Sequence, residues 1–198
     1  MQSIVFDAGW PIWLLLVLSV TALALIIERA LSLRTQRICP AELTAQVLQM
    51  VRAGQDTPAA IEKLDASCAQ GRILATLLRK RTLPADQLRQ AVEDTGQDVA
   101  HDLQRYLPAL ATVATIAPLL GLFGTVVGMI EIFAAYRPDG SDPTQLARGI
   151  SVALYNTGLG ILIAVPVMIA HRYFKTRVDT LLLRMEQSAR RVSETMRG

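Results

Sequence analysis

Chemically versatile side chains are scarce in this chain. Its 198 residues include only two histidines and two cysteines, and aromatic residues make up 5%. His101 and His171 lie far apart, and no cluster of His, Cys and Asp has metal-ligand spacing. No nucleophile motif occurs, and the glycines of residues 121–128 lack the Lys-Ser/Thr pair of a phosphate-binding loop. The sequence therefore indicates a protein that is not an enzyme and that uses no metal or cofactor.

Charge is also sparse, because 19% of the residues are charged and 52% are hydrophobic. This balance is typical of a membrane protein. Residues 10–27, 107–135 and 149–170 come near or exceed the roughly 20 residues that a helix needs to cross ~30 Å of hydrocarbon. No Lys or Arg precedes the first segment and no Ala-x-Ala site follows it, so we expect an uncleaved anchor.

The basic residues near the spans predict the orientation of the chain. No basic residue precedes the first span, whereas several follow the first and third spans: Arg29, Arg34, Arg37, His171, Arg172, Lys175 and Arg177. Basic flanks mark the cytoplasmic side, so we expect the N-terminus outside and the C-terminus in the cytoplasm. Cys39 and Cys68 then lie in a reducing compartment, where a structural disulfide is not expected. These flanks account for the net charge of +3, which gives no reason to invoke nucleic acid.

Hydrophobic periodicity predicts an all-α membrane protein with three transmembrane helices, two of which extend into a cytoplasmic helical bundle. Thr57-Pro58 has the pattern of a helix start, and Gly71 is expected to break or kink a helix. The spacing from Leu88 to Tyr106 predicts one helix continuous with the second span. We divide the chain into an outer N-terminus with the first span (1–29), a cytoplasmic segment (30–106), the second span (107–135), a periplasmic loop (136–148), the third span (149–171) and a cytoplasmic C-terminal helix (172–198).

The C-terminal segment repeats apolar residues every 3.5 positions on average. The members of this tail stripe are Val178, Leu182, Met185, Ala189, Val192 and Met196. Such a repeat is typical of helices that pack along their length. We expect the stripe to be covered by copies of the same chain or by the chain's own cytoplasmic helices.

Few polar residues fall inside the spans, where they are costly and usually face a bundle interior or water. By helix rise, Thr125 and Thr157 lie at similar depths, roughly 16 Å and 12 Å from the outer face. The two hydroxyls either line one polar spot or bond to carbonyls of their own helices. Asn156 has four hydrogen-bonding positions to satisfy, so it either joins helices or lines a pore.

Other residues of the spans are candidates for packing and access. Gly121, Gly124 and Gly128 permit close approach between helices, and Pro118 and Pro166 are expected to bend the second and third spans. Glu131 is the one carboxylate inside a span. It is interpreted as a snorkelling or outer-vestibule group near the membrane–water interface.

Two segments carry a resemblance to a known family. Residues 117–130 read APLLGLFGTVVGMI and residues 149–160 read GISVALYNTGLG, with Ala164-Val165-Pro166 shortly after. In order, spacing and three-span topology the chain resembles the ExbB/TolQ group of the MotA/TolQ/ExbB proton-channel family. The resemblance implies a pentamer with a pore lined by the second and third spans and with the first span toward lipid. It also implies that two helices of a single-span ExbD/TolR-like partner occupy the pore, each with a proton-carrying aspartate.

By resemblance, Thr125 and Thr157 lie beside the partner aspartate, and the protein converts proton motive force into work on a TonB- or TolA-like protein. The family commonly has a glutamate at the position of Val152, so a role for that carboxylate does not transfer to this chain. Glu131 is a candidate replacement. The missing glutamate also leaves open a non-conducting membrane scaffold of the same fold. The sequence does not determine whether the protein serves a TonB, a Tol or another system.

Overall fold

A computed structural model describes residues 10–135 and 143–197, and every regular element in this part of the chain is a helix. The helices are α2 (Pro11–Ser32), α3 (Thr35–Ile38), α4 (Leu43–Arg52), α5 (Pro58–Ser67), α6 (Ala69–Arg79), α7 (Ala85–Gln104), α8 (Leu107–Ala135) and α9 (Pro143–Arg197). The chain forms two compact units. Unit 1 comprises residues 1–28 and 106–173, and unit 2 comprises residues 29–105 and 174–198.

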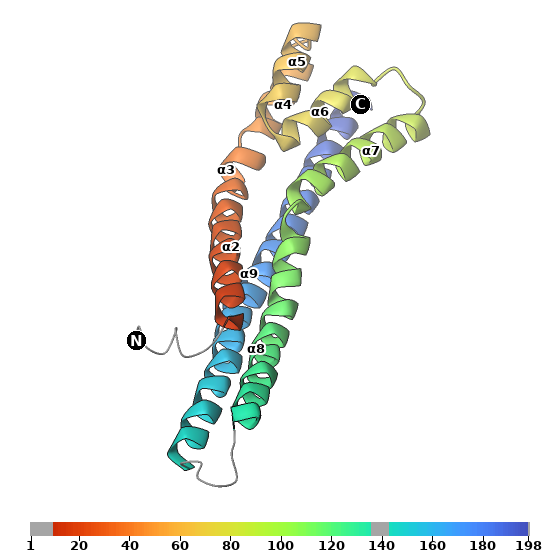
Figure 1. Ribbon diagram of the computed structural model, residues 1–198. Helices are drawn as coiled ribbons and strands as arrows, with labels where there is room; N and C mark the ends of the chain where they lie inside the picture. Colours follow the sequence, from red (N-terminus) through yellow and green to blue (C-terminus); the bar gives the residue numbers. More distant parts are fainter. Residues whose placement is uncertain (1–9, 136–142, 198) are drawn as a thin grey trace. The chain divides into compact units, whose positions relative to one another are not determined.

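Three helical stretches are long and apolar enough to cross a membrane, and they contain α2, α8 and the first part of α9. This finding confirms the predicted all-α chain with three apolar spans. In unit 1, α8 and the first part of α9 run side by side (Figure 1). The predicted outer N-terminus up to residue 9 and loop residues 136–142 lie outside the described residues. The loop was expected to reach residue 148, but α9 already begins at Pro143. Proline suits a first helical position because its φ is fixed near the helical value and no amide bond is lost there.

The helix predicted to run unbroken from Leu88 into the second span is interrupted. The first of the two resulting helices, α7, ends at Gln104. Arg105 and Tyr106 then form a turn, and α8 begins at Leu107. Pro108 accounts for the break. It has no amide hydrogen to donate to the carbonyl of Gln104, four residues earlier, and its ring clashes with that carbonyl.

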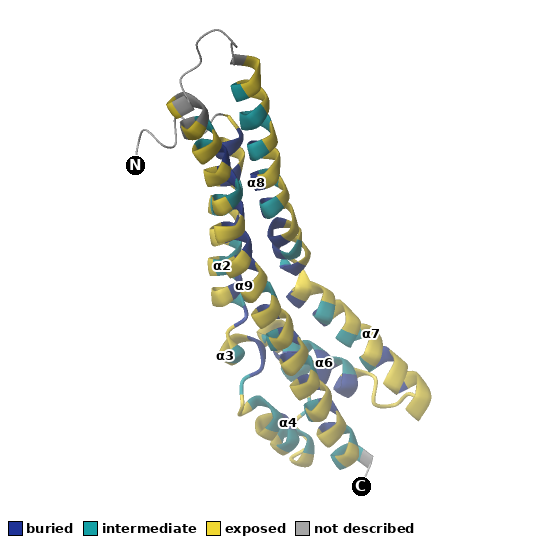
Figure 2. Ribbon diagram, turned by 90° about the horizontal axis from the view of Figure 1, so that it is seen from below, coloured by how far each residue is buried: buried dark blue, intermediate teal, exposed yellow. Residues whose placement is uncertain are grey.

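The long C-terminal helix is present, since α9 runs without interruption through Pro166 to Arg197. Within unit 2 its tail stripe is covered by the chain itself, because Val178, Met185, Ala189 and Val192 are all buried. The buried leucine of the second turn is Leu181, whereas Leu182 is half-buried. Figure 2 shows this buried side of α9. A sister subunit is therefore not needed to cover the tail stripe.

Helix α6 packs between α5 and α7 in unit 2. The predicted start at Thr57 is confirmed, because its hydroxyl accepts the backbone N–H of Ala60 at 3.3 Å. Contrary to the prediction, no helix break occurs at Gly71. The break falls at Cys68, and Gly71 lies within α6, where an added Cβ would lie 2.2 Å from the Leu64 carbonyl oxygen. Glycine therefore permits the close contact between α5 and α6.

Polar contacts also join the helices of unit 2. Gln70 is fully buried and donates to the hydroxyls of Thr44 and Ser188, at 2.9 and 3.0 Å. Arg29, which is 4% exposed, donates to the carbonyl of Leu103 at 3.1 Å, a favourable place for a cation near a helix C-terminus.

The two cysteines are free thiols. Burial raises the pKa of the Cys39 thiol, and the positive charge of Arg184 opposes this shift in part. The Sγ atom of Cys68 accepts the backbone N–H of Gly71 at 3.3 Å, so this side chain caps the start of α6.

Candidate functional site: the seam between α8 and α9

Small residues bring α8 and α9 into backbone contact within unit 1. A Cβ added to Gly121 would lie 2.7 Å from the carbonyl oxygen of Asn156, and one added to Gly124 would lie 2.8 Å from the Cβ of the same residue. A Cβ on Gly128 would lie 3.2 Å from the Cβ of Ala153. The three glycines singled out in the sequence therefore face α9. Such contacts replace the hydrophobic force that is missing between helices in lipid.

Further residues complete this seam, and the sequence did not single them out as contact residues. A Cβ on Gly160 would lie 2.6 Å from the carbonyl oxygen of Ala117, and one on Gly149 would lie 2.6 Å from a carbon of Ile132. On α8 the seam residues are Ala117, Gly121, Gly124, Gly128 and Ile132, and on α9 they are Gly149, Ala153, Asn156 and Gly160. Both sets repeat every three or four residues, which was the available signal.

The seam fixes the register of the two antiparallel helices. Gly124 meets Asn156, so the next residues, Thr125 and Thr157, lie at nearly the same level along the pair. Each threonine directly follows a seam residue and is turned from it by about 100°. Because the helices are right-handed and run in opposite directions, these two turns bring both threonines to the same flank of the pair. We call this side the threonine flank.

The remaining members of the threonine flank are apolar. Residues that directly follow a seam residue include Leu122, Phe133, Leu154 and Ile161, which are 55%, 63%, 62% and 49% exposed. Helix α2 begins on another side of α8, where the rings of Trp10 and Phe123 meet edge to face with centroids 5.9 Å apart. Phe123 precedes the seam residue Gly124 and is therefore turned away from the threonine flank. The flank is a largely apolar surface in which the two threonines are the polar positions.

The two hydroxyls have different hydrogen-bonding states. The Thr125 hydroxyl donates to the Leu122 carbonyl at 2.6 Å, so it is bonded to its own helix. The Thr157 hydroxyl oxygen is buried, and no described residue forms a hydrogen bond with it. A buried hydroxyl without a partner costs free energy, on the order of 1–3 kcal/mol. Of the pair, Thr157 therefore has the hydroxyl whose hydrogen-bonding capacity is not satisfied within the described chain.

Asn156 lies inside the seam rather than on an open surface. Its side chain is 1% exposed, and the absence of a Cβ at Gly124 leaves the space that its amide occupies. The sequence left two roles open for this residue, joining helices or lining a pore. Its position between α8 and α9 is that of a residue that joins helices within one chain.

Glu131 and Val152 lie on the flank opposite the threonines. Each directly precedes a seam residue, Ile132 or Ala153, so each is turned away from the threonine flank. Gly128 meets Ala153 and Ile132 meets Gly149, so Glu131 and Val152 differ by about two residues in level. The Glu131 side chain is exposed. The carboxylate therefore lies near the position where the resemblance places the family glutamate.

Prolines are accommodated inside both helices. Pro118 lies within α8 and Pro166 within α9, and neither ends its helix. The expected bends at these residues stay predictions. Among residues 10–135 and 143–197, no group of three or more His, Cys, Asp and Glu residues is arranged to hold a metal ion.

Comparison with known proteins identifies the family. The sequence profile described as the MotA/TolQ/ExbB proton channel family matches residues 65–187, well over half of the chain. The chain is 30% identical over 167 residues to a putative biopolymer transport protein ExbB-like 3 from Synechocystis sp., covering 82% of this chain and 79% of the relative. It is also 35% identical over 104 residues to biopolymer transport protein exbB1 from Vibrio cholerae, covering 52% of this chain and 46% of that protein.

A third relative is the Tol-Pal system protein TolQ from Haemophilus influenzae, 38% identical over 80 residues, which are 40% of this chain and 35% of the relative. The chain thus spans less than half the length of the Vibrio and Haemophilus proteins. The matched residues 65–187 contain the whole α8–α9 seam and both threonines. The chain belongs to the MotA/TolQ/ExbB proton channel family, in which it resembles the ExbB/TolQ group.

Proposed function

We propose that this protein is an inner-membrane proton-channel subunit that converts proton motive force into mechanical work for an outer-membrane process. The observation that carries the proposal is the pair of threonines at one level on one flank of the α8–α9 pair. Hydroxyls both donate and accept hydrogen bonds, so they can solvate a carboxylate in its charged and its neutral form. They add no fixed charge that would compete with the moving proton.

The threonine flank fits the wall of a pore that another helix fills. Its exposed apolar residues, such as Leu154 and Ile161, need a cover other than water, and Thr125 and Thr157 supply hydrogen bonds at a single level. A transmembrane helix with one aspartate suits this surface. We propose that two such helices, from a dimer of a single-span ExbD/TolR-like protein, occupy the centre of a homo-pentamer of this chain.

The position of α2 agrees with this arrangement. Its start contacts Phe123, which is turned away from the threonine flank, so α2 does not occupy the proposed pore wall at this level. We propose that α2 faces lipid, where exposed residues such as Trp13, Val17 and Val20 suit the hydrocarbon. The basic residues after α2 and in α9 support an orientation with a periplasmic N-terminus and a cytoplasmic unit 2.

The energetics allow such a motor. One charge that crosses a potential of 100 mV releases ~2.3 kcal/mol, enough to bias a rotation if protons do not leak. The partner that receives the work is proposed to be a TonB- or TolA-like protein, in keeping with relatives named for biopolymer transport and for the Tol-Pal system.

A second candidate is a non-conducting membrane scaffold with the same fold. The observation in its favour is Val152, which replaces the family's common glutamate with a side chain that carries no proton. Glu131, on the same flank and close in level, supports retained conduction instead. The two candidates differ in whether protons move.

The test is to co-express this chain with single-span membrane proteins encoded by neighbouring genes. The complex that forms is then purified and reconstituted in vesicles. With an imposed potential, we expect proton uptake that depends on the partner and stops when the partner's aspartate is replaced by asparagine. A complex that assembles with its partner but moves no protons, and whose host needs no proton motive force for the dependent process, would establish the scaffold instead.

A further inference from the structure

Unit 2 carries a stripe of arginines along one side of α9. Arg177, Arg184 and Arg191 are spaced by seven residues, so they lie on the same face of the helix. Arg184 and Arg191 are exposed, and Arg177 donates to the hydroxyl of Thr35 at 2.6 Å. Because a helix advances about 10 Å in seven residues, the three cations form a row rather than a cluster. We call this row the arginine stripe.

The arginine stripe borders a cleft against α3 and α4. This cleft has a volume of about 300 Å³, and its lining includes Thr35, Cys39, Thr44, Arg184 and Arg191. Among the described residues that line it there is no carboxylate. Two exposed guanidinium groups therefore border an open cleft whose walls provide no counter-charge. This surface is suited to an acidic partner.

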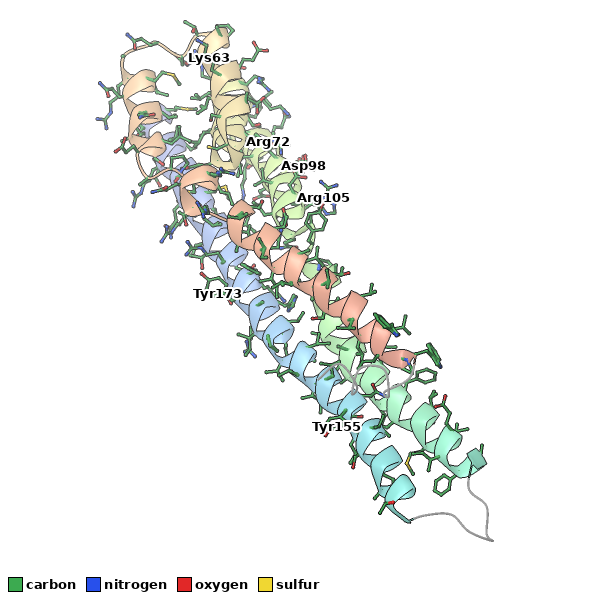
Figure 3. All side chains as sticks on the ribbon, turned by 60° about the vertical axis from the view of Figure 1, so that its left-hand side comes forward. Lys63, Arg72, Asp98, Arg105, Tyr155 and Tyr173 are labelled. Atoms are coloured by element: carbon green, nitrogen blue, oxygen red, sulfur yellow. The ribbon has the colours of Figure 1, made fainter. Side chains whose placement is uncertain are left out.

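An acidic surface of matching character lies elsewhere on unit 2. Asp94 and Asp98 are exposed on α7 and lie one turn apart, on neighbouring positions of the same face. Neither forms an ion pair within the part of the chain that the structure describes. Asp102, one turn further, is paired with Arg72 of α6 at 2.8 Å. Figure 3 labels Asp98 beside Arg72 on this side.

The two charged surfaces cannot meet within one unit 2. In both ribbon views α7 lies on one side of this unit and α3 and α4 lie on the other, with α9 between them (Figures 1 and 2). A contact between surfaces of opposite charge on different sides of the same protein is head-to-tail. Repetition of such a contact closes into a ring or extends into a filament, whereas a two-fold dimer would need one self-complementary surface.

We propose that the arginine stripe, with its cleft beside α3 and α4, docks the acidic face of α7 from a second copy of this chain. The inference rests on the proposed oligomer and names the surfaces that meet in unit 2. Arg184 and Arg191 are the basic contacts, and Asp94 and Asp98 are the acidic ones. Exposed ion pairs contribute more to orientation and partner choice than to affinity, so this contact sets how neighbouring copies are oriented in the ring.

Cross-linking of the full-length chain in native membranes tests the contact. In a background with Cys39→Ala and Cys68→Ser, which keeps the polar cap of α6, the pair Asp98→Cys and Arg191→Cys is treated with a flexible bis-maleimide. We expect a ladder of covalent oligomers from dimer upward, because every copy carries both reactive surfaces. The matched control is Asp98→Cys with Arg190→Cys, whose second cysteine lies one residue away on another face of α9 and should yield no ladder.

Charge reversal provides the second measurement. Arg184→Glu with Arg191→Glu should abolish a ladder formed through cysteines at exposed positions adjoining the contact, and adding Asp94→Lys with Asp98→Lys should restore it. Arg190→Glu should leave it unchanged. A ladder unaffected by both reversals, or a loss that reciprocal reversal does not rescue, would overturn the proposal, including the case where the stripe binds an acidic protein or anionic lipid.

A variant that lacks proton transport separates this inference from the proposed function. The ladder should persist in a Thr157→Val chain, because that substitution lies in unit 1. If the unsubstituted complex moves no protons but the ladder forms, the proposed function is wrong and the contact holds. If proton transport is intact and neither ladder nor rescue is seen, the contact alone is wrong.

Discussion

Hydroxyl groups at the middle of the α8–α9 pair are the smallest elements on which the proposed mechanism depends. The Thr125 hydroxyl is bonded to its own helix, whereas the Thr157 hydroxyl is buried without a partner among the described residues. In a pore that holds a partner carboxylate, the unbonded hydroxyl is the one that gains a hydrogen bond. The structure therefore ranks two residues that the sequence treated as equals.

We expect Thr125→Val and Thr157→Val each to reduce proton-coupled activity severely, with the larger loss for Thr157→Val. Valine retains the shape of threonine and removes the hydroxyl, so expression and assembly should survive. Loss of one hydrogen bond to a carboxylate costs on the order of 1–3 kcal/mol, or roughly five- to over a hundredfold in rate. The measurement is proton uptake into vesicles per complex, with assembly checked by native mass spectrometry. Wild-type uptake by the double variant would show that the threonines are structural.

Glu131 offers a second prediction about a single residue. If its carboxylate replaces the missing family glutamate near Val152, Glu131→Gln should abolish proton-dependent function while the oligomer persists, because glutamine is similar in size but cannot carry a proton. Growth under the condition that requires the system, with the oligomer measured in parallel, checks this. Normal growth of the Glu131→Gln strain would return this residue to the role of a vestibule group.

At the scale of secondary-structure elements, glycines allow the helices of this protein to come into close contact. The α8–α9 contact exists because Gly121, Gly124 and Gly160 present backbone where other residues would present a Cβ. Gly158 is different, since a Cβ added there would have no atom of the described chain within 4 Å. The chain therefore contains its own matched pair of glycine positions for testing the contact.

We expect Gly124→Ala to destabilise the helix pair and Gly158→Ala to have little effect within one subunit. The alanine Cβ at position 124 would lie 2.8 Å from the Cβ of Asn156, and such overpacking typically costs about 1–3 kcal/mol. The readout is thermal unfolding in mild detergent. Asn156→Ala keeps the Cβ but removes the amide carbon and nitrogen, which would lie 2.9 and 3.0 Å from the new Cβ, so its combination with Gly124→Ala should recover part of the loss. Equal stability of the two glycine variants would contradict the contact.

At the scale of the whole molecule, the two units differ in how far they bury their own apolar side chains. Unit 2 buries its own tail stripe, including Val178, Met185 and Val192, so the stripe gives no argument for assembly. Unit 1 leaves large apolar side chains exposed on several sides of α2, α8 and α9, among them Leu154 and Tyr155. Figure 3 labels Tyr155. Lipid covers part of this surface, and we propose that sister subunits and the partner helices cover the rest.

Native mass spectrometry in mild detergent should therefore detect a homo-pentamer that is held mainly through unit 1. Substitution of an exposed unit 1 residue away from the threonine flank, such as Leu162→Asn, should weaken the pentamer, whereas Leu182→Asn, at a half-buried position of unit 2, should act chiefly on folding. Detection of a stable monomer for the unsubstituted chain would contradict the pentamer.

The sequence by itself determined the three apolar spans, the family and the residues worth testing, because span length, helical period and the motifs around Gly124 and Asn156 are local properties. It could not determine what covers the tail stripe, because a heptad repeat records only that a face is buried and not by which chain. It also overlooked the interruption at residues 105 and 106, although Pro108 was the available signal.

Tertiary structure decided the remaining questions, since they concern distances between helices. It placed Asn156 inside the seam, separated the hydrogen-bonding states of Thr125 and Thr157, and turned Glu131 to the flank of Val152. Each of these outcomes depends on the register of α8 against α9. That register is set by contacts between residues that lie from 17 positions apart (Ile132 and Gly149) to 43 positions apart (Ala117 and Gly160), a range over which the local sequence pattern carries no information.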